Sequence, residues 1–148
     1  MRSTLIILQL FCTASTLWAQ IPPDWYLQAV SRADSLYAEK QYDAAAHVFS
    51  DAFKKCPNCI RWTDKYNAAC GWALAGNTDN ALANMMYVAN TRSYTKYNQL
   101  VNDRDLESLH GSKKWNEIVN KVRANRDSSI AHPDFKLVYM FDTIYRQD

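Results

Sequence analysis

The sequence has few residues that interrupt a helix: three glycines and four prolines among 148 residues. It also has few β-branched runs and no stretch of alternating polar and apolar residues, which would be typical of a half-buried strand. Because 48% of the residues are apolar and only 22% are charged, we expect a folded core rather than disorder. A chain of this length has room for one domain of ordinary size, and we expect it to be all-α.

Several kinds of chemistry lack their usual residues. A net charge of +2 is too balanced for a nucleic-acid interface, so no nucleic-acid partner is expected. There is no glycine-rich phosphate loop and no H-E-x-x-H metal motif. The three histidines, His47, His110 and His132, are scattered and have no spacing that indicates a catalytic triad. The sequence therefore predicts a protein that is not an enzyme and that needs no cofactor and no metal.

The first nineteen residues have the layout of a secretory signal peptide. Arg2 supplies a positive start, "LIILQLF" is a short apolar run, and the small Ala19 precedes the expected cleavage site. A membrane anchor is the weaker interpretation, because the run is shorter than the ~20 apolar residues needed to span a bilayer. We expect an exported protein, periplasmic or secreted, with no membrane insertion after the signal is removed.

The rest of the chain reads as successive helices. Asp24 is predicted to cap a helix over 25–38, whose apolar stripe comprises Trp25, Ala29, Ala33, Leu36 and Tyr37. A second stripe, Ala45, Val48, Phe49, Ala52 and Phe53, stops at Pro57. A third helix over 61–75 is predicted to end at Gly76 in a left-handed turn, and Asp79 to open a fourth.

Small and apolar residues recur with a constant offset of 36 residues. The corresponding pairs are Ala33 and Ala69, Tyr42 and Thr78, Ala45 and Ala81, Phe49 and Met85, and Ala52 and Val88. Small residues suit the positions where two helices of a hairpin cross closely, and larger ones suit the positions where the next hairpin stacks. The offset therefore predicts two equivalent helical hairpins.

These residues resemble the tetratricopeptide repeat, a helix–turn–helix unit of about 34 residues. "YAEKQYDAAAHVFSDAFKKCP" matches its pattern through Tyr42, Ala45, Phe49, Ala52 and Pro57, and "YNAACGWALAGNTDNALANM" through Ala69, Trp72, Gly76, Asp79 and Ala81. The second unit departs at Met85 and Val88 and has no closing proline. The resemblance implies a short hairpin array, an α-α superhelix, with a concave face that binds a protein or peptide.

Residues 20–126 are expected to form this repeat domain together with a helical cap. "DRDLESL" and the later Trp115 resemble the degenerate closing segment found after short bacterial arrays. Asp103 or Asp105 is predicted to cap one short helix, and Ser112 the next. Residues 127–148 are expected to form a connector and a last helix. That helix resembles the opening of a poorly characterised bacterial domain, so we expect a fragment of a longer protein.

The motif "CPNC" places Cys56 and Cys59 around a two-residue turn. Such a pair can be a local disulfide, two free thiols, half a metal site or a redox centre. A redox centre is disfavoured because Cys56 follows the end of a predicted helix, where the dipole raises a thiol pKa. In an exported protein, we favour a Cys56–Cys59 disulfide between the repeats, with Cys70 left unpaired.

The resemblance also implies which residues line the concave face. They are Val30, Asp34 and Tyr37 from the first unit, and Tyr66, Asn67, Cys70 and Ala73 from the second. We select Asp34, Tyr37, Tyr66, Asn67 and Cys70 as candidate ligand-binding residues. Two alternatives remain open: the cap folds over this face and fills it, or the domain only positions a further C-terminal region that is catalytic.

Overall fold

The computed structural model describes residues 21–131, so the predicted signal peptide and the predicted last helix lie outside the described residues. Every regular element in 21–131 is helical, which confirms the all-α class. The elements are α1 (Asp24–Ala38), α2 (Tyr42–Lys55), η1 (Pro57–Cys59), α3 (Trp62–Leu74), α4 (Thr78–Asn90), α5 (Tyr97–Asn102), η2 (Arg104–Leu109) and α6 (Lys113–Ala131). Between residues 21 and 131, no helix is long and apolar enough to cross a membrane.

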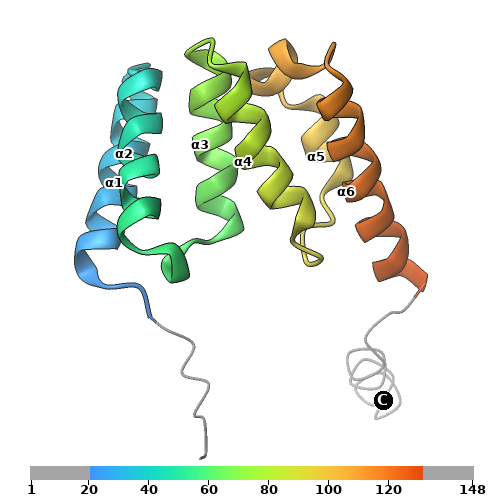
Figure 1. The fold of residues 1–148 in the computed structure, drawn as a ribbon, viewed down its shortest axis with the longest axis horizontal. Helices are drawn as coiled ribbons and strands as arrows, with labels where there is room; N and C mark the ends of the chain where they lie inside the picture. The colour runs from blue at the N-terminus through green and yellow to red at the C-terminus, as the bar shows by residue number, and fades with distance from the viewer. Residues whose placement is uncertain (1–20, 132–148) are drawn as a thin grey trace, which may run out of the picture.

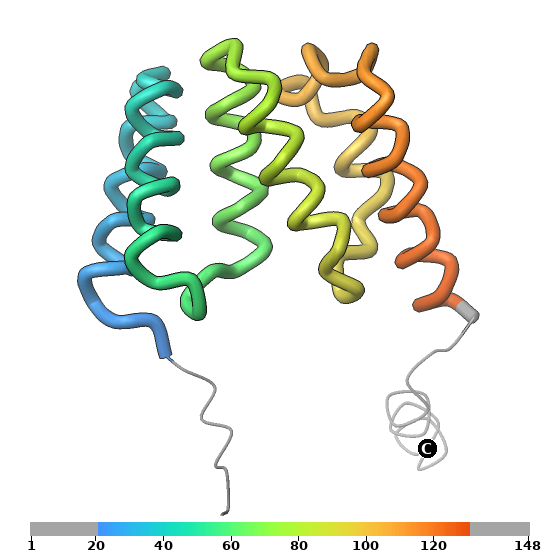
Figure 2. Tube along the Cα trace, in the orientation of Figure 1, coloured from blue at the N-terminus to red at the C-terminus, as the bar shows by residue number. Residues whose placement is uncertain are grey.

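The helices form an array of hairpins in two layers (Figures 1 and 2). Helix α1 packs on α2 and α3 packs on α4, while contact between α2 and α3 joins the two hairpins. A third, less regular pair follows, in which α5 and α6 are neighbours and η2 packs on α3. We call α1, α3 and the α5–η2 segment the inner layer, and α2, α4 and α6 the outer layer.

Four of the five repeated pairs are buried in both hairpins, whereas Tyr42 is partly buried and its counterpart Thr78 is exposed. Ala33, Ala45, Phe49 and Ala52 are buried in the first, as are Ala69, Ala81, Met85 and Val88 in the second. The two hairpins approach each other closely at Gly71, where an added Cβ would lie 3.3 Å from the carbonyl oxygen of Tyr42 and 3.4 Å from the Cβ of Ala46. The small residues around this glycine therefore allow α3 to approach α2 closely.

The same left-handed turn ends the first helix of each hairpin. Gly76 follows α3 with a φ of 79°, which confirms the predicted helix stop. Lys40, 36 residues earlier, follows α1 with a φ of 62°. Its turn is closed by a hydrogen bond from the Gln41 N–H to the Leu36 carbonyl at 2.8 Å. The equivalence is hidden in the sequence because lysine stands where glycine is preferred.

Two predicted helix caps are wrong. Asp24 lies within the first turn of α1 after the extended Pro23, and no side-chain bond caps that helix. Helix α4 is capped by Asn77 instead of Asp79, because the Asn77 Oδ1 accepts a hydrogen bond from the Asn80 N–H at 3.2 Å. Asp79 falls in the first turn of α4, where its charge still favours the helix dipole.

The closing segment begins as predicted and continues further than predicted. The Asp103 carboxylate caps η2, and the Ser112 hydroxyl accepts from the Trp115 N–H at 3.0 Å. Helix α6 then extends to Ala131, past the predicted end at residue 126. The predicted start of the connector at 127 is therefore wrong, because no glycine or proline interrupts the chain between Gly111 and Pro133.

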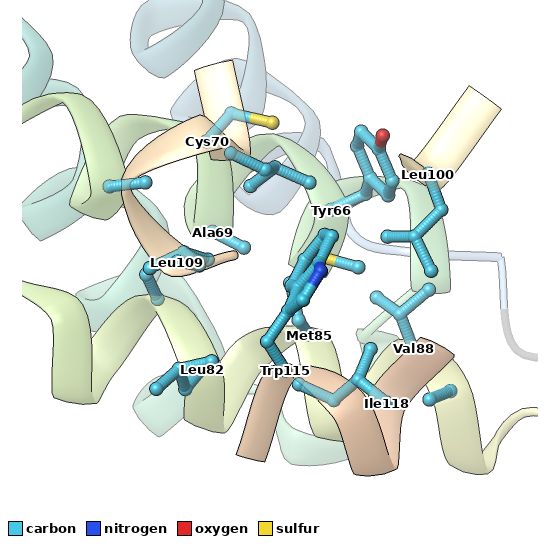
Figure 3. Close-up of a cluster of buried hydrophobic side chains, with 14 of the residues drawn as sticks. Tyr66, Ala69, Cys70, Leu82, Met85, Val88, Leu100, Leu109, Trp115 and Ile118 are labelled. Carbon is cyan, nitrogen blue, oxygen red and sulfur yellow. The ribbon is translucent and has the colours of Figure 1, made fainter. Parts of the chain in front are cut away.

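Buried side chains form two clusters. The larger one joins α3 and α4 to the closing segment, and Figure 3 shows Tyr66, Met85, Trp115 and Ile118 within it. The smaller one lies in the first hairpin around Phe49 and includes residues of α1, α2 and α3. The closing segment therefore contributes to the core of the second hairpin rather than only covering its end.

Tyr26 faces the core instead of the predicted Trp25. Trp25 is 42% exposed, whereas Tyr26 is fully buried and donates a hydrogen bond to the Asp64 carboxylate at 2.9 Å. Asp64 is itself 2% exposed and also accepts two bonds from the Arg61 guanidinium, at 2.9 and 2.8 Å. This buried polar network connects α1 to the start of α3. It gives the buried Tyr26 hydroxyl a hydrogen-bond partner, and Trp25 has no hydroxyl that could take this place.

Candidate functional site

A pocket of about 310 Å³ lies between α1, α3 and the start of η2. It is lined by Asp34, Tyr37 and Ala38 from α1, by Tyr66, Asn67 and Cys70 from α3, and by Asp103 and Asp105 from the closing segment. We call it the inner pocket. All five residues selected from the sequence line it, so the structure brings them together. Their role in binding a ligand stays a prediction.

Helical spacing explains why these residues meet. On α1, Tyr37 and Ala38 lie three and four residues after Asp34, and on α3, Cys70 lies four residues after Tyr66. Residues at these offsets share one face of a helix, one above the other. Two neighbouring inner-layer helices therefore turn these faces toward the same space.

Two residues predicted for the concave face lie elsewhere. Val30 belongs to the smaller core cluster and Ala73 to the larger one, and neither lines the inner pocket. Val30 is buried with Tyr26 and Ala33, which form the core-facing stripe of α1. The set of residues that the resemblance implies for the concave face is therefore too large, because two of its members pack in the core between helices.

The closing segment covers part of the inner face. The Tyr66 hydroxyl donates to the Asp103 carboxylate at 2.6 Å, and the Tyr37 hydroxyl donates to the Asp105 carboxylate. Tyr66 is only 6% exposed and belongs to the larger core cluster. Burial first, and then these hydrogen bonds, raise the pKa of Tyr37 and Tyr66 well above the usual value of 10.0. Both phenols therefore stay protonated and hold the closing segment against α1 and α3.

Asn67 and Asp34 lie on the exposed side of the pocket. The Asn67 Nδ2 donates to the Asp34 Oδ1 at 3.3 Å, and both residues are exposed. A long, exposed hydrogen bond is easily exchanged for one to a ligand. Among the five selected residues, these two are therefore the most accessible to an incoming molecule.

The inner pocket carries negative charge that the sequence did not indicate. Asp34, Asp103 and Asp105 line it, and none of its lining residues is a lysine, arginine or histidine. Asp103 and Asp105 were interpreted only as possible helix caps. Asp105 bonds Tyr37, which lies 68 positions away in the sequence, and Asp103 bonds Tyr66, which lies 37 positions away. Neither helical spacing nor cap chemistry predicts contacts over such separations.

Cys70 lies beside these two aspartates. Ligand atoms of Cys70, Asp103 and Asp105 are all within 4.8 Å of one another, a grouping that was not predicted. Burial first, and then the negative charges of Asp103 and Asp105, raise the pKa of the Cys70 thiol. The thiol is therefore held in its neutral form, a poor nucleophile and a poor metal ligand unless it loses its proton.

The cysteines of "CPNC" form the predicted disulfide. Cys56 and Cys59 are bonded across η1, with their Cα atoms 5.3 Å apart. The Cys59 N–H donates to the Cys56 carbonyl at 3.0 Å, so a tight backbone turn brings the two side chains together. Cys59 is buried in the smaller cluster, and neither cysteine lines the inner pocket.

The inner pocket thus combines three carboxylates with two carboxylate-bonded tyrosines and an exposed amide. Each carboxylate can accept several hydrogen bonds, so the tyrosines leave acceptor capacity in place for a ligand. Such a lining suits a positively charged hydrogen-bond donor.

Comparison of the chain with protein-family models, with curated proteins and with solved structures finds no match.

Proposed function

We propose that this domain is a non-enzymatic, protein- or peptide-binding module of the tetratricopeptide type, and that its inner pocket takes a basic group of the partner. The observation that carries the proposal is the pocket's lining: one carboxylate from α1, two from the closing segment, and no cationic residue. The ammonium of a lysine or of a chain terminus, or the guanidinium of an arginine, supplies the donors that these carboxylates accept.

The size and position of the pocket support one side chain as the part of the partner that enters. At about 310 Å³, it lies at the lower end of the range of small-ligand sites. Asp34 and Asn67 at the exposed side can bond the partner first, whereas Asp103 and Asp105 are half-buried. Charge attraction at half-buried carboxylates is less screened than at the surface.

A titration with defined peptides tests this proposal. Four acetylated and amidated peptides differ only in a central lysine, arginine, alanine or glutamate, and binding is followed by the backbone amide signals of the protein in NMR spectra. We expect the lysine and arginine peptides to bind and to shift the signals of Asn67 and Cys70. Equal binding of the alanine peptide, or shifts confined to other helices, would contradict the proposal.

A matched pair of variants assigns the effect to the pocket. We expect Asp34→Asn to weaken binding of the lysine peptide by about five- to tenfold, because one accessible carboxylate charge is lost. Asp51→Asn is the control, because Asp51 is exposed on α2, pairs with Lys54 and does not line the pocket. An equal effect of both variants would indicate general charge attraction instead of a site.

We also propose that the protein is exported after cleavage of its signal peptide. The Cys56–Cys59 disulfide supports this proposal, because structural disulfides persist mainly in oxidising compartments. Intact-mass analysis of the exported protein should show a chain that begins at Gln20. Alkylation in denaturant without reductant should label Cys70 alone. A chain that retains Met1, or labelling of all three cysteines, would contradict export by this route.

A further inference from the structure

A second hollow, of about 430 Å³, lies between α2 and α4 in the outer layer, over one side of α3. We call it the outer groove. Its lining includes Phe53 and Lys54 from α2, Lys65 from α3, and Asn80, Asn84 and Tyr87 from α4. None of its lining residues is shared with the inner pocket, and none is acidic. The charge of its lining is therefore positive, whereas that of the inner pocket is negative.

Lys65 is the central charged group of the outer groove. Its ammonium lies 4.2 Å from the centre of the Phe53 ring and 5.3 Å from the centre of the Tyr87 ring. The side chain is half-buried, and no carboxylate within residues 21–131 lies within 4.0 Å of it. Burial lowers the pKa of Lys65, which is the effect expected of an ammonium without a counter-ion.

The surroundings of Lys65 leave room for a counter-ion. Two ring faces attract the ammonium, but cation–π contacts replace only part of the hydration that a charge loses on burial. The other lysine of the groove, Lys54, is exposed and already paired with Asp51 at 3.2 Å. An incoming carboxylate would therefore find one uncompensated cation, and the 41%-exposed Tyr87 offers apolar area beside it.

We propose that the outer groove is a docking site for an acidic side chain of a partner protein. The carboxylate of an aspartate or glutamate pairs with the Lys65 ammonium, and a neighbouring apolar side chain of the same segment packs against the Tyr87 ring. Charge complementarity selects this occupant, because the groove contains two lysines and no acidic residue. A basic segment, suited to the inner pocket, is repelled here.

Peptides also provide the probe for this site. One acetylated and amidated peptide carries glutamate between two leucines, and its matched partner carries glutamine at that place. With the full chain, we expect the glutamate peptide to bind at least tenfold more tightly and to shift the amide signals of Lys65, Asn84 and Tyr87. Equal affinities, or shifts at Asn67 and Cys70 instead, would overturn the proposal.

Three lysine variants make the test specific. Lys65→Met keeps the aliphatic stem and removes the charge, so it should abolish the preference for glutamate, whereas Lys65→Arg should keep it. Lys121→Met, on the exposed part of α6, should leave it unchanged. An unaltered preference in Lys65→Met would overturn the proposal. Asp34 lines the inner pocket, so Asp34→Asn should not change binding of the glutamate peptide. The proposals for the two sites can therefore be refuted independently.

Two other occupants are separated by further measurements. If inorganic phosphate produces the same shifts and competes at similar concentration, the groove is a simple anion site and the proposal fails. If the wild-type chain self-associates in sedimentation experiments and Lys65→Met does not, the occupant is a second copy, which also overturns it. A monomeric chain whose groove prefers the glutamate peptide to phosphate supports the proposal.

Discussion

At the scale of single residues, Tyr66 has two roles, and its position in the sequence does not show which of them a substitution would remove. Its ring belongs to the larger core cluster, and its hydroxyl holds Asp103 of the closing segment at 2.6 Å. A residue on the edge of a pocket can therefore be essential for folding without contacting any ligand. This distinction matters for every variant designed to test binding.

Substitutions of Tyr66 should lower stability in two steps. We expect Tyr66→Phe to reduce the free energy of unfolding by about 1–2 kcal/mol, because the half-buried Asp103 carboxylate loses one of its two donors. Tyr66→Ala should cost about 3–5 kcal/mol through the cavity that it leaves. Urea unfolding measures both, and the exposed Tyr87→Phe is a control expected to change little. A fully stable Tyr66→Ala would place the ring outside the core.

Alkaline pH should destabilise the fold through three tyrosines. Tyr26, Tyr37 and Tyr66 each donate to an aspartate, and burial with these bonds raises their pKa above the usual 10.0. Their stabilisation is complete below pH 10 and is lost as pH rises further, because the unfolded chain releases these protons first.

The measurement is the urea dependence of unfolding at pH values from about 8 to about 11. We expect the free energy of unfolding to fall above pH 10, and the fall to be less steep in Tyr66→Phe. Tyr42→Phe is the matched control, because the described structure gives the Tyr42 hydroxyl no carboxylate partner and its loss should leave the slope unchanged. Identical slopes in both variants would refute the assignment to Tyr66.

At the scale of elements, the first helix of each hairpin ends in the same left-handed turn, but a different residue stands at that turn. Gly76 adopts its positive φ at little cost, whereas Lys40 adopts a φ of 62° with a Cβ that disfavours it. The turn geometry is nevertheless the same in both hairpins. Hairpin geometry therefore outweighs local preference at Lys40, and the first hairpin carries strain that the second does not.

Lys40→Gly should therefore stabilise the protein by about 1 kcal/mol, and Gly76→Ala should destabilise it by a similar amount. Thermal or urea unfolding measures both changes. Glu39→Gly is the control from the same turn, because Glu39 has a φ of −80° and gains nothing from glycine. Stabilisation by Glu39→Gly as well would show that flexibility, and not the positive φ, is responsible.

At the scale of the whole molecule, the closing segment is part of the core. Leu100, Leu106, Leu109 and Ile118 are fully buried in the same cluster as Tyr66 and Met85. Its aspartates also complete the inner pocket. Stability and the candidate site thus depend on the same contact between η2 and α3.

Truncation after Asn90 should consequently leave two hairpins that do not fold cooperatively. The cut exposes the apolar face of α3 and α4 that α6 and η2 cover. We expect loss of a sharp thermal transition in circular dichroism and increased binding of a hydrophobic dye. A chain cut after Ala131 should keep the sharp thermal transition and the low dye binding of the full chain. A cooperative transition in the shorter fragment would show that the closing segment is only a cover.

The sequence by itself determined the local features of this protein. Apolar periodicity predicted the helical elements of both hairpins, the 36-residue offset predicted their equivalent burial, and "CPNC" predicted its own disulfide. The resemblance to the tetratricopeptide repeat also selected five residues that line one pocket. These features depend on residues a few positions apart, where backbone geometry leaves few alternatives.

Only the tertiary structure decided how charge is distributed between the two hollows. Asp105 meets Tyr37 across 68 positions of the chain, and Asp103 meets Tyr66 across 37. Lys65 lies in a groove between α2 and α4, and no carboxylate of residues 21–131 lies within 4.0 Å of its ammonium. Tyr26 replaces Trp25 in the core because its hydroxyl reaches the buried Asp64. Such contacts depend on how whole helices pack, which local periodicity does not specify.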